Sequence, residues 1–424
     1  MARDVDPGAI MAATPTRRGP IDGFSHPEFR KVRTAFERQL HRTRGGAAVA
    51  VYHRGELVVD LWGGTRDDEH DPWESDTVAM CFSTTKGITA TALHLLVDRQ
   101  EVDVDDPVAH YWPEFAANGK EDVTVRHLLS HTAGLHRLRS LIDRADRMLD
   151  WDYMVDALAA APPAYEPGTA AGYHALTFGW LVGEVVRRVS GQPVDAFIQQ
   201  EIVAPLELDG CWVGLPHDQR HRLAPLAPFM SLPNVNLGPA AGAAKWLNRQ
   251  AGKMVSAVGS PVNPRRIMNA LAPRGIEDVF VDDELLGAEL PALNGCFTAR
   301  SLAKMYAMLA GFGTIGHTTL MSPDTVEEAR QIQHRHRDLV LVLPMLWRLG
   351  YHRIPAGPTA FGHFGFGGSG GWADPDLDLS VAMVCNRGTG TPIGDMRLVA
   401  LGRAAAASIQ ELEDRPPSAV DTAR

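Results

Sequence analysis

A serine and a lysine three residues apart form the clearest chemical signal in the sequence. Ser83 follows a short apolar run that ends at Phe82, and Lys86 comes about one helical turn later. In a helix this spacing brings both side chains to one face, so the amine can reach the hydroxyl. A serine where the chain becomes helical also has a natural N-cap position, where the helix dipole favours negative charge. The pair predicts a serine nucleophile whose proton passes to an amine.

The residues around Lys86 strengthen this interpretation. Between Asp76 and Asp98 it is the only formally charged residue, and a helix that is apolar on nearly all sides is normally buried. Because burial disfavours the ammonium form, we expect a lowered lysine pKa. A second Ser-x-x-Lys, at Ser301 and Lys304, lies in an amphipathic pattern typical of a surface helix. Ser301 is therefore not expected to react.

Ser369 is the other candidate nucleophile, since it is the serine of a Gly-x-Ser-x-Gly motif. In hydrolases built on that motif, a helix follows the serine, and an acid and then a histidine come later in the chain. Here an Asp-Pro turn and a strand pattern follow, and no histidine comes after His363. The glycines of residues 367–371 are better explained by close approach of the backbone to a ligand.

Composition and charge exclude several classes of partner. The 424 residues carry a net charge of −10, with Lys and Arg scattered, so we expect neither a nucleic acid nor a membrane as partner. No apolar run approaches the roughly 20 residues of a membrane span. The first 18 residues lack the apolar core of a signal peptide, and we interpret them as part of a disordered leader. The widely spaced cysteines indicate reduced core thiols of a cytoplasmic protein: Cys81, Cys211, Cys296 and Cys385.

The histidines give no metal-binding pattern. None of the closely spaced pairs forms His-Glu-x-x-His, the helical zinc motif: His127 with His131, His217 with His221, and His334 with His336. We therefore expect no metal site.

Strand patterns lie near both ends of the sequence, and helical patterns lie between them. Two apolar runs joined by His53-Arg54-Gly55 predict a hairpin, with strands at 47–52 and 56–62. Later strands are predicted at 339–343, 347–351, 359–363, 371–373 and 379–386. Helices are predicted at 24–42, 123–135, 151–160, 176–189, 194–203 and 394–412. Residues 214–291 are rich in proline and glycine, which is typical of a lid or a pocket wall.

This arrangement predicts an α/β domain assembled from both ends of the sequence, with a mainly helical domain inserted. We assign residues 23–102 and 291–412 to the α/β domain and residues 103–290 to the helical domain. Residues 1–22 are then a disordered leader, and residues 413–424 a loose tail.

Three motifs occur in the order seen in the serine β-lactamase and penicillin-binding protein superfamily. They are Ser83-Thr84-Thr85-Lys86, Tyr173-His174-Ala175 before a helix, and His363-Phe364-Gly365 on a late strand. Over roughly residues 24–412 the sequence resembles the class C β-lactamase-like esterases, also called family VIII carboxylesterases. The resemblance implies a β-lactamase/transpeptidase-like fold, with an antiparallel sheet flanked by helices. It implies no cofactor.

Carried over to this sequence, the resemblance implies that Ser83 attacks the acyl carbon. Lys86 and Tyr173 would share the proton transfers, and either one could be the general base. The oxyanion hole would consist of the backbone N–H groups of Ser83 and Phe366. Without the other motifs, Tyr173 could equally be a plain aromatic residue beside a helix start.

Two departures from the lactamase pattern bear on the substrate. Ala175 replaces an asparagine that contacts an amide, and His363 replaces a lysine that supplies a fixed positive charge for a carboxylate. With Phe364 and Gly365, these residues would line the substrate site, although His363 could also be purely structural. A site without those two polar contacts suits a neutral ester better than a β-lactam.

We therefore expect a serine carboxylesterase that cleaves small-molecule esters of small carboxylic acids. The alternative is an amide-bond hydrolase on the same scaffold: a β-lactamase, a D-amino-acid peptidase or an oligoamide hydrolase. A non-catalytic binding protein is a third reading, which the joint presence of Ser83, Lys86 and Tyr173 disfavours. The acyl length, the alcohol and the oligomeric state are left open by the sequence.

Overall fold

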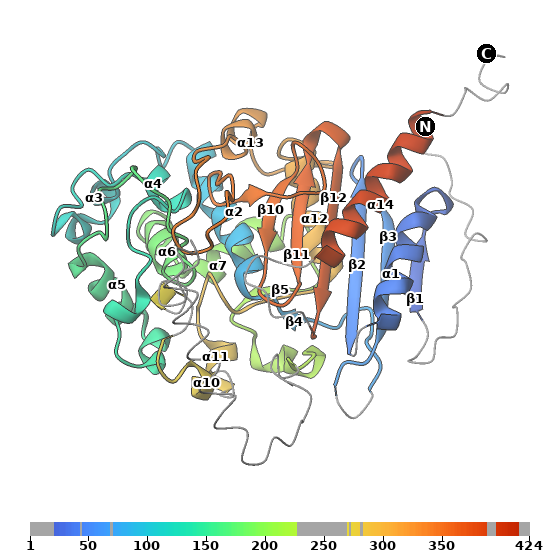
Figure 1. Cartoon of the computed structure of the whole chain (residues 1–424), viewed down its shortest axis with the longest axis horizontal. Coiled ribbons are helices and arrows are strands. Elements are labelled where there is room, and N and C mark those ends of the chain that lie inside the picture. The colour runs from blue at the N-terminus through green and yellow to red at the C-terminus, as the bar shows by residue number, and fades with distance from the viewer. Residues whose placement is uncertain are drawn as a thin grey trace, which may run out of the picture.

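Strands from both ends of the chain pair in one antiparallel sheet (Figure 1). The computed structural model describes residues 21–42, 45–67, 71–226, 269–270, 273–279, 283–387 and 396–414. Within these residues the sheet has seven strands, in the order β1-β3-β2-β12-β11-β10-β9. Their bounds are β1 Ile21–Ser25, β2 Gly46–His53, β3 Glu56–Gly64, β9 His352–Arg353, β10 Phe361–Phe364, β11 Gly370–Asp374 and β12 Leu379–Cys385.

The predicted hairpin and the last three predicted strands are confirmed. β2 and β3 form the hairpin, and β12 pairs with β2 to join the two ends of the chain. Both faces of these central strands are buried, as expected when helices cover a sheet on each side. Along β12, Val381 and Met383 face one core, whereas Ala382 and Val384 face the other.

Helices cover both faces of the sheet. On one face α1 (Arg30–Arg42) and α14 (Met396–Glu413) pack against each other and against the strands (Figure 1). On the other face α12 (Ala299–Ala310) lies across β2, β11 and β12. The prediction that this helix lies at the surface is wrong, because nearly all of it is buried. Arg300, one of its two charged residues, is paired with Asp60 and Asp209, which come from other parts of the chain.

Two segments near the sheet differ from the sequence predictions. The helix predicted at 24–42 begins only at Arg30, because Ile21–Ser25 forms the edge strand β1. Ile21 and Asp22 of the predicted leader are therefore strand residues. The strands predicted at 339–343 and 347–351 are wrong, since this segment consists of turns and irregular backbone, with one isolated bridge between Trp347 and His334. The backbone N–H groups of Val340 and Leu341 bind the side chain of Asp338 instead of a neighbouring strand.

Short helices and a small sheet fill the middle of the chain. The helix at 151–160 is confirmed as α5, and that at 176–189 is confirmed with a shift of one residue at each end, as α6. The helix predicted at 123–135 is only five residues long. Bounds in this part are α3 Val108–Tyr111, α4 Val125–Leu129, α5 Trp151–Ala160, α6 Thr177–Ser190, α7 Val194–Ile198, α10 Ile276–Val279, α11 Asp283–Gly287 and α13 Pro323–Ala329. β4 (Ala79–Met80), β6 (Gly295–Phe297) and β5 (Cys211–Val213) form the small sheet, and β7 (Thr314–Ile315) and β8 (Thr318–Thr319) a hairpin.

The domain division itself stays a prediction. The predicted leader up to residue 20, the tail beyond residue 414 and much of the predicted pocket wall lie outside the described residues. All four cysteines are buried, and none of them forms a disulfide with another described residue. In the part of the chain that the structure describes, no helix combines the length and the apolar character needed to cross a membrane.

Candidate active site

Ser83 lies in a 3-10 turn, Phe82–Thr84, between β4 and the buried helix α2 (Thr85–Asp98). The expectation that Ser83 caps this helix is wrong, since the N-cap residue is Thr84 and its side chain makes no capping hydrogen bond. The Ser83 hydroxyl is instead engaged by two side chains. Its Oγ lies 2.9 Å from Lys86 Nζ and 2.7 Å from the Tyr173 hydroxyl. The structure thus brings the three candidate catalytic residues together around one oxygen atom.

Lys86 is fully buried, and its amine has three neighbours. Besides Ser83 Oγ, these are the carbonyl oxygens of Ala175 at 2.6 Å and Ala292 at 3.0 Å. Burial lowers the lysine pKa well below its ordinary value of 10.5. A neutral amine has two N–H groups and one lone pair, and a carbonyl can only accept. When both N–H groups are donated to the carbonyls, the lone pair is left for the Ser83 hydroxyl.

Tyr173 is also buried, and its hydroxyl donates to Ser83 Oγ. Burial raises the pKa of Tyr173 above its usual range, so the phenol remains protonated at neutral pH. Its ring is stacked on Trp347, with the two centroids 5.3 Å apart and the planes 10° from parallel. Because the phenol keeps its proton and a neutral Lys86 has a lone pair, the Ser83 hydroxyl can accept a hydrogen bond from Tyr173 and donate one to Lys86 at the same time.

The third motif lies at the end of β10, beside the turn that carries Ser83. The ring of His363 is 6.3 Å from that of Tyr173, and its Nδ1 donates to the carbonyl of Phe364 at 2.9 Å. Burial lowers the histidine pKa well below 6.5, so the ring is neutral. A Cβ on Gly365 would lie 2.1 Å from the carbonyl oxygen of Cys81, so only glycine allows this close approach.

The remaining predicted site residues are placed differently. The Phe364 side chain packs in the core beneath α14, on the face of the sheet opposite α12. Its ring therefore does not line the site beside Ser83. Ala175 contributes its carbonyl to Lys86, and its methyl group is buried. The ring of Phe366 contacts that of Phe82, with centroids 5.6 Å apart. The oxyanion hole formed by the N–H groups of Ser83 and Phe366 remains a prediction.

Ser369 has a structural environment. Its hydroxyl accepts the backbone N–H of Cys385 at 3.1 Å, and its carbonyl accepts the N–H of Gly365 at 2.7 Å. Both contacts stabilise the turn between β10 and β11. No amine or carboxylate bonds to this hydroxyl among the described residues, so the site offers no base for it.

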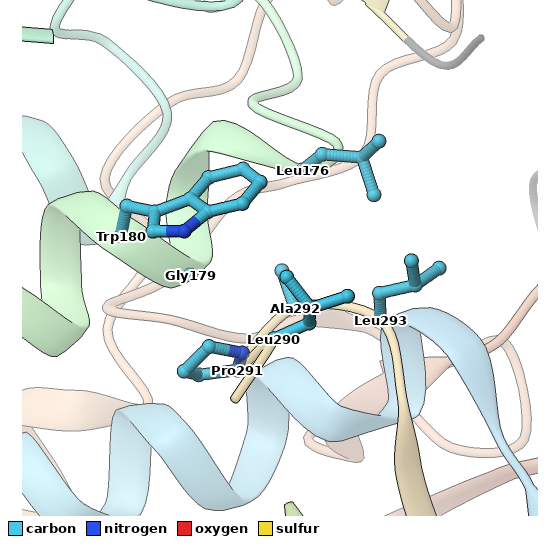
Figure 2. Close-up of a pocket in the computed structure, with 7 residues that line it drawn as sticks. All are labelled: Leu176, Gly179, Trp180, Leu290, Pro291, Ala292 and Leu293. Atoms are coloured by element: carbon cyan, nitrogen blue, oxygen red, sulfur yellow. The ribbon is translucent and has the colours of Figure 1, made fainter. Parts of the chain in front are cut away.

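An apolar pocket adjoins the carbonyls that hold Lys86. Figure 2 shows its two walls, which are the start of α6 and the turn before β6. Leu176 directly follows Ala175, and Ala292 itself lines the pocket. In the view, the indole of Trp180 covers the side opposite the Leu290–Leu293 turn. The lining residues are Leu176, Gly179, Trp180, Leu290, Pro291, Ala292 and Leu293.

Sequence reasoning missed several of these contacts. Trp347 was assigned to a strand, and neither Asp338 nor the Ala292 carbonyl was considered. A backbone carbonyl carries no residue-type signal, and Ala292 is 206 positions away from Lys86. Among the described residues, no group of three or more His, Cys, Asp or Glu is arranged to hold a metal ion.

Several known proteins are similar to this chain in sequence and fold. The profile of the family described as Beta-lactamase matches residues 32–406. The esterase/beta-lactamase LipL of Mycobacterium tuberculosis is 37% identical over 394 residues, which cover 90% of this chain and 88% of LipL. A crystal structure of a family VIII carboxylesterase superposes with a TM-score of 0.80 and 34% identity, over 92% of this chain and 99% of that one.

A penicillin-binding protein homologue from Caulobacter crescentus gives a TM-score of 0.79 with 36% identity, over 92% of this chain and 99% of that one. The resemblance inferred from the three motifs is therefore confirmed, and so is the fold that it implied. The chain belongs to the Beta-lactamase family.

Proposed function

We propose that the chain is a serine hydrolase that cleaves esters of small carboxylic acids through an acyl-enzyme on Ser83. The observation that carries the proposal is the Ser83 hydroxyl, held between a buried amine at 2.9 Å and a buried phenol at 2.7 Å. A hydroxyl next to a neutral amine can give up its proton as it attacks a carbonyl.

Acylation begins when Ser83 Oγ attacks the ester carbonyl and its proton passes to Lys86 Nζ. The negative charge on the former carbonyl oxygen is stabilised by the N–H groups of Ser83 and Phe366. The C–O bond to the alcohol then breaks, and the alkoxide takes a proton from the Lys86–Tyr173 pair. In deacylation a water molecule gives a proton to the same pair and attacks the acyl carbon. Release of the carboxylic acid then restores the Ser83 hydroxyl.

An ester fits the site better than a β-lactam. Ala175 offers no amide, and the neutral ring of His363 offers no fixed positive charge for a carboxylate. Similarity to a family VIII carboxylesterase and to the esterase/beta-lactamase LipL supports the ester reading. Similarity to LipL, an esterase/beta-lactamase, also favours a minor lactamase activity as the second candidate function. We further propose a cytoplasmic location, which the four buried thiols support, because reducing compartments keep cysteines from forming disulfides.

The proposal predicts strong preference for an ester over a lactam. We expect kcat/KM for p-nitrophenyl butyrate to exceed that for a chromogenic cephalosporin by about 100-fold or more. One missing neutral hydrogen bond and one missing charged contact together account for roughly 3 kcal/mol of discrimination, or about 100-fold. Steady-state assays of both substrates with one enzyme preparation measure the ratio. A ratio near or below one would favour the amide-bond alternative.

The apolar pocket beside Lys86 is too tightly closed to hold a water molecule, so we propose that the Trp180 indole keeps long acyl groups out of it and limits the acyl length. Trp180→Ala would remove an indole from the pocket wall (Figure 2). We expect the ratio of kcat/KM for the octanoate to that for the acetate ester to rise about tenfold, because each newly buried CH2 contributes about 0.8 kcal/mol. Assays of p-nitrophenyl acetate, butyrate, hexanoate and octanoate measure this shift.

Trp151→Ala is the matched control for Trp180→Ala. The indole of Trp151 donates to Glu184 at 2.9 Å and packs on Gly183, away from the pocket-lining residues. Its removal should change stability without changing the preference for acyl length. An unchanged profile in folded Trp180→Ala would place the acyl group elsewhere.

A further inference from the structure

A buried carboxylate lies behind Tyr173. Asp338 is 2% exposed, and its Oδ1 accepts the backbone N–H groups of Val340 at 2.7 Å and Leu341 at 2.8 Å. Its Oδ2 accepts the indole N–H of Trp347 at 3.0 Å. The backbone of Tyr173 also lies close enough to this carboxylate to lower its pKa. One side chain therefore contacts both the backbone of Tyr173 and the residue on which its ring is stacked.

The segment that Asp338 organises forms one wall around Tyr173. Trp347 stacks on the tyrosine ring almost in parallel, and the Leu339 N–H donates to the Ala171 carbonyl at 2.8 Å. A small hydrophobic cluster, separate from the two main cores, surrounds Tyr173 there. Its members are Ala171, Tyr173, Ala175, Ala270, Val340, Leu341 and Trp347. The direction of the phenol thus depends on how residues 338–347 are held.

This segment has an unfavourable backbone conformation. Val342 has φ +65° and Leu346 has φ +52°. Both values lie in the left-handed region, which residues other than glycine rarely adopt and β-branched residues such as valine adopt least often. Such residues persist only where the surrounding contacts impose them, and they occur often near functional sites. The Asp338 carboxylate accepts three N–H donors in this segment, and the Asp338 backbone carbonyl accepts the N–H of Val342 at 2.9 Å.

We infer that Asp338 is a positioning residue, which directs the Tyr173 hydroxyl toward Ser83 Oγ through Trp347 and the Tyr173 backbone. The inference rests on the proposed function, since it assigns Tyr173 a part in the reaction. Beyond burial, the negative charge of Asp338 is a second cause that raises the tyrosine pKa and keeps the phenol protonated.

Asp338→Asn and Trp347→Phe test the inference, alone and combined. Asparagine keeps an oxygen for Val340 and Leu341 but turns its NH2 group toward the Trp347 N–H, so two donors face each other. We expect kcat for p-nitrophenyl butyrate to fall about 10-fold to 100-fold, as small misplacements of catalytic groups do. Because the substrate pocket is untouched, we expect KM to change less than about threefold.

The double variant separates positioning from general destabilisation. Trp347→Phe keeps a stacked ring but removes the indole N–H, so by itself it should lower kcat less than Asp338→Asn does. In Asp338→Asn/Trp347→Phe the facing donors are gone, and kcat should recover to near that of Trp347→Phe. Asp374→Asn is the matched control, since Asp374 is 1% exposed and accepts a hydrogen bond from Thr359 at 2.6 Å. Thermal unfolding of each variant gives the folded fraction.

Several outcomes would overturn the inference. One is a wild-type kcat in folded Asp338→Asn, and another is a loss of kcat that only follows the folded fraction or that Asp374→Asn shares. Additive effects in the double variant would also contradict it. Should Asp338→Asn fail to fold, a wild-type kcat in Trp347→Phe is sufficient to overturn it. Failure of the proposed function is seen separately, as ester turnover that survives Ser83→Ala.

Discussion

Ser83→Ala is expected to abolish ester turnover, with kcat lowered by about 10⁴-fold or more, the scale seen when a serine nucleophile is removed. Without Oγ no acyl-enzyme can form, and the remaining site only holds the substrate. The structure provides no second hydroxyl between Lys86 and Tyr173 among the described residues. Initial rates with p-nitrophenyl butyrate measure the loss. Mass spectrometry of the quenched reaction should show an acyl adduct on the wild type alone.

Ser369→Ala is the matched control. Its hydroxyl accepts the Cys385 N–H inside a turn, so its loss should cost about 1 kcal/mol of stability and leave kcat within a fewfold of wild type. Turnover that persists in Ser83→Ala but vanishes in Ser369→Ala would reverse the assignment. Persistence in both variants would mean that the hydrolysis does not use either serine.

The local sequence pattern was sufficient to predict those helices and strands whose buried residues follow the pattern of apolar residues in the sequence. The β2–β3 hairpin follows from two apolar runs joined by a turn, and α5 follows from helical spacing. α12 was misread because Arg300 and Lys304 suggested a solvated face. In the fold, Asp60 on β3 and Asp209 neutralise Arg300. Those partners lie far apart in sequence, so helical spacing alone could not reveal them.

The candidate site was only partly predictable for the same reason. Ser83 and Lys86 are three residues apart, so their contact can be predicted from the sequence. The lack of other charged residues near Lys86 can be read from the sequence in the same way. The meeting of Ser83 and Lys86 with Tyr173 could be inferred only through the resemblance of the motifs. Trp347 was missed because its apolar surroundings suggest a strand. In the fold its backbone makes only an isolated bridge with His334, and its indole N–H donates to Asp338.

Lys86→Met is the second large effect that we expect. Methionine fills most of the buried volume but cannot take a proton, so kcat/KM should fall by about 10³-fold to 10⁴-fold, near the upper range for a lost general base. The carbonyls of Ala175 and Ala292 lose their donor, so the variant should also be less stable by about 1–3 kcal/mol. Kinetic assays on the folded fraction separate the two effects.

Lys120→Met is a matched control within the same chain. Lys120 is also fully buried, but its amine donates to three carbonyls, those of Ala117, Ala159 and Ala161. Three pure acceptors use all three N–H groups of an ammonium, and burial lowers the pKa of Lys120 only to about 8. Its replacement should reduce stability to a similar degree without lowering kcat/KM. Equal losses of activity in both variants would mean that Lys86 acts only through folding.

The direction in which kcat/KM changes with pH distinguishes Lys86 acting as a base from Lys86 acting as a fixed positive charge. A neutral Lys86 accepts the proton, so kcat/KM should rise with pH through the lowered lysine pKa, with a midpoint well below 10.5. Between that pKa and 10.5 the unfolded chain binds the extra proton, so this residue makes the protein more stable as pH rises. Lys86→Met should lose both trends. A wild-type rate that falls as Lys86 loses its proton would show that the ammonium is the active form, and Tyr173 would then be the base.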